Sequence, residues 1–287
     1  MENKHGLTSK ISQINAGHYD FVSEVWQKIY GDNFHAGYFY RPDEPYEQAT
    51  KNLITEMAKM GTFSKDSKVV DVGCGIGGPA ITLHEKFGCY VHGITISPRG
   101  VEIATESAKK KGFGSHVQFS VRDAMDNQFP DASFDIVWGM ESFHLMENMD
   151  KVFSECFRVL KPGGQFLLCD NTAGKRTLTE TEVVKYYKEL RVLERVFGKT
   201  HTKTLPGYEE SARKAGFVDV SSRDINAETM PPSIKHFRKK AHDQFAELAR
   251  LSSEKYMQDF LKMCDTWELF YAEGVMSYGL LKALKPR

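Results

Sequence analysis

The stretch that decides the fold is Lys68-Val69-Val70-Asp71-Val72-Gly73-Cys74-Gly75-Ile76-Gly77-Gly78. A β-branched run of this kind is typical of a buried strand in a parallel sheet. The glycines that follow let the backbone turn sharply and approach a ligand closely, because they carry no Cβ. The pattern therefore predicts a nucleoside cofactor at the carboxyl end of the first strand of an α/β sheet.

Two classes of enzyme share this glycine-rich turn. Gly73, Gly75 and Gly78 match the G-x-G-x-x-G fingerprint of dinucleotide-binding proteins, so an NAD-dependent oxidoreductase is one alternative. Asp71 lies two residues before the first glycine and completes D-x-G-x-G. This resembles the first motif of the class I S-adenosylmethionine (SAM)-dependent methyltransferases, and the resemblance implies that Asp71, Gly73 and Gly75 contact SAM.

The ends of the next two predicted strands favour the methyltransferase. The strand over 89–96 ends near Thr95 and Ile96, where a nucleotide-binding unit usually has a ribose-binding acid. Thr95 departs from that acid in both classes, although its hydroxyl can still bond a ribose. The strand over 117–122 ends at Asp123-Ala124, and in the methyltransferases this acid typically caps the adenine amino group. The resemblance implies cofactor contacts at Thr95, Ile96, Asp123 and Ala124.

The remaining segments extend the same pattern. Residues 134–141 predict a fourth strand, with Trp138 as a further cofactor contact, and Leu-Lys-Pro-Gly-Gly at 160–164 leads into a fifth. Hydrophobic periodicity predicts helices at 10–30, 46–60, 79–87, 98–112, 149–160, 178–197 and 207–215. A strand at 217–220, a helical insertion at about 233–268 and a last strand at 275–281 follow. We therefore expect an α/β fold, a doubly wound Rossmann-like sheet of seven strands with the last antiparallel, and a helical lid.

This organisation divides the chain into three predicted parts. Residues 1–60 form an N-terminal helical lid segment, and residues 61–172 form the SAM-binding core. Residues 173–287 complete the core and contain a substrate-binding helical insertion at about 226–270.

Composition limits the function further. The chain has 287 residues, 41% of them hydrophobic, and a formal net charge of zero, so it lacks the basic excess typical of nucleic-acid binding. Its five cysteines form neither a metal pair nor a disulfide framework. No apolar run approaches the roughly 18 residues that span a membrane. We expect a cytoplasmic protein acting on a small molecule, and the apolar helices outside the core make a homodimer reasonable.

Several short segments suggest the acceptor. Residues 17–20, 34–39 and 140–144 resemble sterol, tocopherol and related natural-product methyltransferases, while residues 228–232 and 271–274 resemble prenyl-diphosphate C-methyltransferases. Methylation of an alkene carbon leaves a carbocation, which needs aromatic faces or a carboxylate nearby and then a base. Glu141 is the expected base. Aromatic candidates for the acceptor site are Tyr19, Trp26, Phe34, Tyr38, Phe39 and Phe143, with Tyr38 also grouped with the catalytic residues.

Alternatives remain open at this stage. An O- or N-methyltransferase would need at most a base, for which His35 and His144 are candidates. A prenyl diphosphate would need basic donors, such as Arg176 or the cluster at 235–240, and could bring a magnesium ion held on the diphosphate itself. A charge run on a helix is more often a solvated face, and aromatic residues at helical spacing are more often core. The predicted function is C-methylation of an isoprenoid alkene, with possible cyclisation of the cation.

Overall fold

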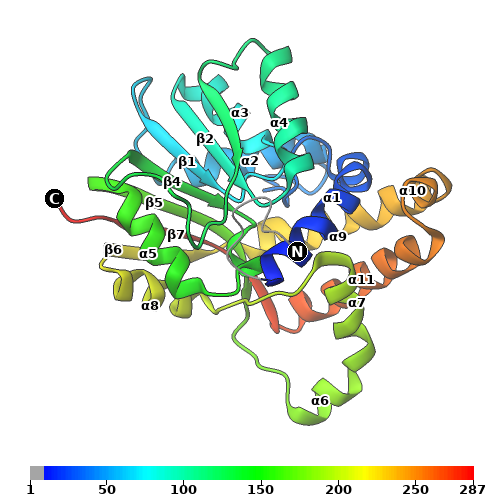
Figure 1. The fold of residues 1–287 in the computed structure, drawn as a ribbon. Helices are drawn as coiled ribbons and strands as arrows, with labels where there is room; N and C mark the ends of the chain where they lie inside the picture. Colours follow the sequence, from blue (N-terminus) through cyan, green and yellow to red (C-terminus); the bar gives the residue numbers. More distant parts are fainter. Residues whose placement is uncertain (1–9) are drawn as a thin grey trace.

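The computed structural model describes the backbone of residues 10–287, and their side chains except those of residues 10–16 and 19. Its seven-stranded sheet has the order β3-β2-β1-β4-β5-β7-β6 (Figure 1). Strands β1 to β5 are parallel, and β7 is antiparallel to both β5 and β6. The strands are β1 (Lys68–Val72), β2 (Tyr90–Thr95), β3 (Val117–Val121), β4 (Phe134–Met140), β5 (Leu160–Ala173), β6 (Val218–Asp224) and β7 (Met276–Leu284). The predicted sheet and its antiparallel last strand are confirmed.

Helices cover both faces of this sheet. Val69 belongs to the apolar cluster on one face and its neighbour Val70 to the cluster on the other, because successive strand residues point to opposite sides. The first face is covered by α2 (Tyr46–Ala58), α3 (Gly78–Phe87) and α4 (Pro98–Lys110), and the second by α5 (Met149–Val159) and α8 (Leu205–Ala215). The strand order reverses between β1 and β4. At such a point the connections diverge and leave a crevice at the carboxyl ends of the strands.

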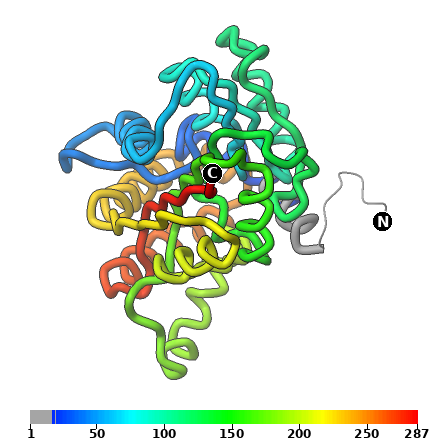
Figure 2. The backbone as a smooth tube through the Cα atoms, turned by 90° about the vertical axis from the view of Figure 1, so that its left-hand side faces the viewer, coloured from blue at the N-terminus to red at the C-terminus, as the bar shows by residue number. Residues whose placement is uncertain are grey.

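A second group of helices packs together beside this edge of the sheet (Figure 1). These are α1 (Lys10–Tyr30), α7 (Tyr187–Phe197), α9 (Asn226–Asp243), α10 (Phe245–Leu251) and α11 (Glu254–Ala272). The short helix α6 (Glu180–Lys185) projects from the body at the bottom of both views (Figures 1 and 2). None of its residues is buried, so it is held mainly by its connections.

Two helical predictions need correction. The single helix expected at 178–197 is divided at Tyr186, whose backbone leaves the helical range (φ −93°, ψ 15°), into α6 and α7. The insertion helix begins at Asn226 rather than near 233 and contains Pro231 and Pro232. Proline removes the amide that would bond the carbonyl four residues earlier. The Glu228 carbonyl, left without that donor, accepts instead from the Phe39 amide at 2.8 Å, which makes the early start possible.

Candidate active site

A cavity lies at the carboxyl edge of the sheet, where β1, β2, β3 and β4 end. Its walls come from the glycine-rich turn, the residues after β2, β3 and β4, helix α1 and the loop that follows it. The lining residues used below are Trp26, Phe34, His35, Asp71, Gly73, Gly75, Thr95, Ile96, Asp123, Ala124, Glu141 and Phe197. Seven of the eight predicted cofactor contacts are therefore brought together around one cavity.

The glycine-rich turn is shaped by two local requirements. Gly73 and Gly75 have φ values of +82° and +53°, in the left-handed region that favours glycine. A Cβ on Gly73 would lie 2.2 Å from the Cβ of Ser142, which follows β4, whereas a Cβ on Gly75 would meet only Phe34, at 3.9 Å. Gly73 thus allows the turn to pack closely against Ser142, and Gly75 leaves the cavity open.

Asp71 is the most unusual polar group in the cavity wall. The residue is 1% exposed, and its Oδ2 has no hydrogen-bond partner among the described residues. Burial raises the pKa of Asp71 from 3.8 to about 7. A buried carboxylate without a partner is costly, and such groups often mark a binding site. A hydrogen-bond donor or a cation in the cavity would satisfy it.

The side of the cavity that Thr95 forms is tied to helix α1. The Thr95 hydroxyl accepts from the Ser97 amide at 3.3 Å, and the Ser97 hydroxyl caps α4 by accepting from the Gly100 amide at 2.9 Å. The same hydroxyl donates to Asp20 Oδ1 at 2.5 Å, and the Arg99 amide donates to that oxygen at 3.3 Å. Asp20 therefore joins the helix above the cavity to the wall that Thr95 forms.

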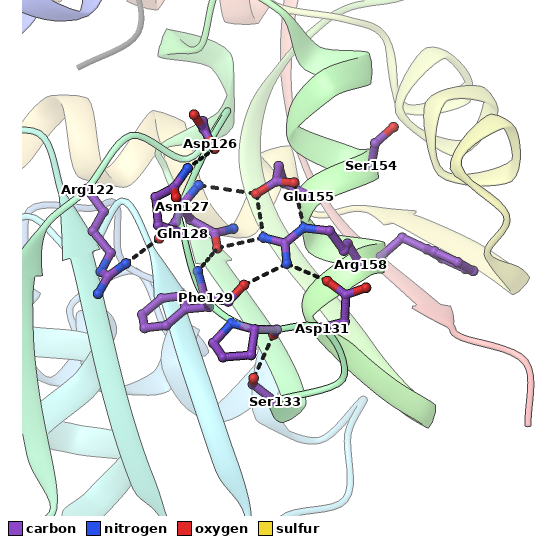
Figure 3. Close-up of polar contacts among 12 residues, drawn as sticks. Arg122, Asp126, Asn127, Gln128, Phe129, Asp131, Ser133, Ser154, Glu155 and Arg158 are labelled. Carbon is purple, nitrogen blue, oxygen red and sulfur yellow. Dashed lines mark hydrogen bonds and ion pairs between the residues drawn. The ribbon is translucent and has the colours of Figure 1, made fainter. Parts of the chain in front are cut away.

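The loop that follows Asp123 is held by the side chains of two arginines, Arg122 and Arg158, as Figure 3 shows. Arg158 of α5 donates to the Phe129 carbonyl at 2.6 Å and to Asp131 at 2.8 Å, and it also pairs with Glu155. Arg122 donates to the Asn127 carbonyl at 2.6 Å. These bonds fix a segment that has no regular structure of its own. They hold the cavity wall around Asp123 and Ala124 in place.

Glu141 joins three distant parts of the chain. It follows β4 with a left-handed φ of +49°, a strained conformation for a residue other than glycine. Its Oε1 accepts from the Ala36 amide and from the Tyr278 hydroxyl of β7, both at 2.6 Å. Burial raises the pKa of Glu141 to about 7, although these two bonds oppose the rise. The carboxyl group is thus held on the cavity wall and takes up or releases a proton near neutral pH.

The two predicted histidines have different surroundings. His35 lines the cavity, and its Nδ1 donates to the Ala36 carbonyl at 2.7 Å, while its Nε2 has no partner among the described residues. Burial lowers the pKa of His35 to about 4, so its ring is neutral. His144 lies instead on a second, adjacent cavity, with its Nδ1 2.5 Å from Asp170 Oδ1. Burial alone would lower the pKa of His144, but the Asp170 carboxylate outweighs it and raises the pKa.

Comparison with known proteins agrees with this geometry. Residues 70–168 match the family model described as a methyltransferase domain. The chain is 32% identical to 27-O-demethylrifamycin SV methyltransferase of Amycolatopsis mediterranei over 281 residues, which are 96% of this chain and 97% of that protein. The chain belongs to the class I SAM-dependent methyltransferases. This membership decides against an NAD-dependent oxidoreductase.

Other methyltransferase relatives include enzymes of different acceptor classes. The chain is 35% identical to sterol 24-C-methyltransferase of Yarrowia lipolytica over 164 residues, 57% of this chain and 42% of that protein. Among solved structures it is similar to the [4+2]-cyclase SpnF, with a TM-score of 0.83, 25% identity and coverage of 98% and 99% of the two chains.

The cavity of this methyltransferase fits SAM. The unpartnered Asp71 carboxylate suits the amino group of the methionine part, and Thr95 and Asp123 offer oxygens to the ribose and adenine. The open side of Gly75 leaves room for the ligand beside the turn. SAM, when bound, supplies a methyl group on a sulfonium, which is an electrophile. Among residues 10–287, no group of three or more His, Cys, Asp or Glu side chains is arranged to hold a metal ion.

Several predicted site residues do not reach the cavity. Trp138 and Phe143 are both fully buried, Trp138 against Phe63 and Phe143 against Phe153 and Phe166, so each is part of the core. Trp138 belongs to the apolar cluster on one face of the sheet. Phe143, in the short 3-10 helix Phe143–Leu145 after β4, belongs to the cluster on the other face. Trp138 is therefore not in a position to contact the cofactor, nor Phe143 the acceptor.

Two candidates near the N-terminus and the predicted anion-binding residue Arg176 also lie outside the cavity. Tyr38 and Phe39 lie in the loop after α1 but do not line the cavity; the Tyr38 ring packs against Tyr40. Arg176 is paired with Glu182 and Glu273, away from the cavity. The side chain of Tyr19 lies outside the described residues. Among the candidates, Trp26, Phe34, His35 and Glu141 line the cofactor cavity, and His144 lines the second one.

Four residues of the site were missed by sequence reasoning. Phe197 borders both cavities, Asp170 pairs with His144, Tyr278 bonds Glu141, and Asp20 fixes helix α1. Only Asp20, within the quoted segment 17–20, lay in a motif singled out beforehand.

In the part of the chain that the structure describes, none of the helices has the length and apolar character needed to span a membrane.

Proposed function

We propose that this methyltransferase transfers the methyl group to a carbon–carbon double bond of an isoprenoid. The observation that carries the proposal is a carboxyl group, Glu141, in the wall of a cavity that also contains the aromatic rings of Trp26, Phe34 and Phe197. The alkene electron pair would form a bond to the methyl carbon while the methyl–sulfur bond of SAM breaks, with its electrons staying on sulfur as a neutral thioether. This leaves a cation on the neighbouring alkene carbon. Loss of a proton from an adjacent carbon to Glu141 restores a double bond.

Each of these groups suits one part of the reaction. Aromatic faces attract a cation by roughly 0.5–2 kcal/mol each, and they offer no nucleophile that would trap it. Glu141 serves as the base because its pKa near 7 leaves a substantial ionised fraction at neutral pH. Its bonds to Ala36 and Tyr278 fix the carboxyl group in one orientation. Since the base acts in its ionised form, turnover should rise with pH through about 7.

Two of the basic groups predicted to bind a diphosphate, Arg238 and Lys239, are already paired with carboxylates. Arg238 is paired with Glu268 at 2.7 Å and Asp265 at 3.1 Å, and Lys239 is paired with Asp243. These cations would have to leave their carboxylates before they held an anion. The proposal therefore concerns the hydrocarbon part of the acceptor, and the assay with and without EDTA tests the role of magnesium.

The test is methyl transfer from deuterium-labelled SAM to geranyl diphosphate, farnesyl diphosphate, geraniol and a sterol, with and without EDTA. We expect a labelled methyl on carbon in at least one of them. Glu141→Gln should lower that turnover by about 100-fold or more while SAM affinity stays within about twofold. Glu210→Gln, an exposed carboxyl change on α8, is the matched control. Full turnover in Glu141→Gln would contradict the role of Glu141.

A second candidate function is O-methylation, which the pair of His144 and Asp170 favours. Both side chains are buried, and a hydroxyl placed at the free side of the imidazole would lose its proton to His144. Label found on a phenolic or alcohol oxygen, together with a large loss in His144→Asn and little in Glu141→Gln, would favour this function over C-methylation.

A further inference from the structure

A second cavity, of about 320 Å³, lies between α7, α11, the C-terminal end of β5 and the N-terminal end of β7. Its wall is mostly hydrocarbon and aromatic. Its apolar lining includes Leu178, Leu190, Leu193, Phe197, Trp267 and Phe270. A concave apolar space with a few polar groups is the usual form of a small-molecule site. Nothing in the SAM-binding role of the first cavity accounts for it.

One side chain belongs to both cavities. The Phe197 ring lies 5.0 Å from the Trp26 ring, which lines the cofactor cavity, and 5.0 Å from the Trp267 ring, which lines the second. His144 stacks beside it, with the ring centroids 6.0 Å apart. Phe197 is therefore the partition between the two spaces.

The outer wall of the second cavity is least secured at Leu178, which precedes α6, none of whose residues is buried. Leu190 and Leu193 lie on α7, which is held by the buried side chains of Val192, Val196 and Phe197. Elements with few buried contacts open at low free-energy cost. A long apolar ligand can thus enter from this side without disturbing the sheet.

We propose that the second cavity binds the uncharged hydrocarbon chain of the acceptor, and that Phe197 is the partition past which the reacting end enters the cofactor cavity. The isoprenoid nature of the chain rests on the proposed function; the binding of an uncharged apolar chain rests on the lining alone. The charged residues of the lining, Glu194 and Lys199, are of opposite sign, and Glu194 is also paired with Arg191 on α7.

The test uses geraniol as the probe with the whole protein. Binding is followed by equilibrium dialysis and by tryptophan emission, since Trp267 is the one of the three tryptophans that lines this cavity. We expect geraniol to change the emission of the wild type. Trp267→Phe should lose that change while dialysis still detects binding.

Leu193→Trp fills the cavity and should weaken geraniol binding at least tenfold, with SAM affinity unchanged. Val184→Trp, on the exposed surface of α6, is the matched control and should bind geraniol normally. If Leu193→Trp does not fold, as judged by loss of SAM binding, Leu190→Trp replaces it. Normal geraniol binding in the filled variant would overturn the inference.

The outcome is separable from that of the proposed function. Binding that is lost in Leu193→Trp, without methyl transfer to any alkene, would retain the apolar acceptor site and reject the isoprenoid reaction. Methyl transfer to an alkene, together with unchanged geraniol binding in Leu193→Trp, would retain the isoprenoid reaction and reject the second cavity as the acceptor site.

Discussion

Asp71→Asn should make the ligand-free protein more stable at alkaline pH and a poorer binder of SAM. The wild-type carboxyl is 1% exposed and its pKa is raised from 3.8 to about 7. A pKa difference of this size corresponds to about 4 kcal/mol between the two protonation states in the folded protein, as an upper limit. Asparagine keeps the shape of the side chain and carries no charge to bury.

The sign of the effect follows from where the proton is held. The folded protein keeps a proton on Asp71 that the unfolded chain releases above pH 3.8, so the free energy of unfolding of the wild type falls as pH rises towards 7. The variant lacks this slope. The stability of Asp71→Asn relative to the wild type should therefore increase by about 1.4 kcal/mol per pH unit between pH 5 and 7, and level off above.

Urea unfolding at pH 5, 6, 7 and 8 without SAM measures this difference. Asp66→Asn, an exposed carboxyl change just before β1, is the control and should show no such trend. An amide that lacks a hydrogen-bond partner costs stability at every pH, so it shifts the curve without changing its slope. A difference that is equal at pH 5 and pH 8 would refute the reasoning. SAM should raise the melting temperature of the wild type more than that of the variant.

Three further changes test how the cofactor cavity is held. Asp20→Ala removes the acceptor of the Ser97 hydroxyl, so stopped-flow measurement should show SAM dissociating several-fold faster, with the melting temperature nearly unchanged. An unchanged dissociation rate would mean that α1 does not help to retain SAM. Arg158→Met should cost about 2 kcal/mol in urea unfolding and weaken SAM binding in titration calorimetry, because several loop acceptors lose their donor. Gly73→Ala places a Cβ 2.2 Å from that of Ser142 at a φ of +82°, so thermal unfolding should show that the free energy of unfolding falls by about 2 kcal/mol or more. A much smaller fall would mean that the turn relaxes around the added methyl group.

The sheet was predictable because each parallel strand ends in a recognisable local signal. Asp71 and the glycines mark the end of β1, Asp123-Ala124 follows β3, and Glu141 follows β4; the structure brings all of these to one edge. Local residue order is sufficient for such features, since parallel strands end at a common edge.

The direction of individual side chains was not predictable in the same way. β4 is buried on both faces, so its apolar run does not indicate which residue faces the cavity and which faces the core. Trp138, a predicted cofactor contact, lies in the core. Phe197 is the last residue of the helix predicted at 178–197. Only the packing of Trp26 and Trp267 around it distinguishes a cavity wall from a core position.

Pairs that depend on strand register were also beyond sequence reasoning. His144 and Asp170 are 26 residues apart, and they meet because Met140 of β4 lies opposite Cys169 of β5. A shift of one residue in that register would turn Asp170 to the other face of the sheet.

The position of β7 has a consequence for how the chain reaches its native state during translation. Both of its neighbours, β5 and β6, precede it in the sequence, so a ribosome-bound chain has made them before residues 276–284 exist. Until then β5 has an unpaired edge and β6 has no partner strand, a combination that invites association with other chains and with chaperones. The Tyr278 hydroxyl that holds Glu141 arrives with the same strand. The wall that holds Glu141 is therefore completed only once β7 has been made. A chain terminated before β7 should be a target for proteolysis rather than a weak enzyme.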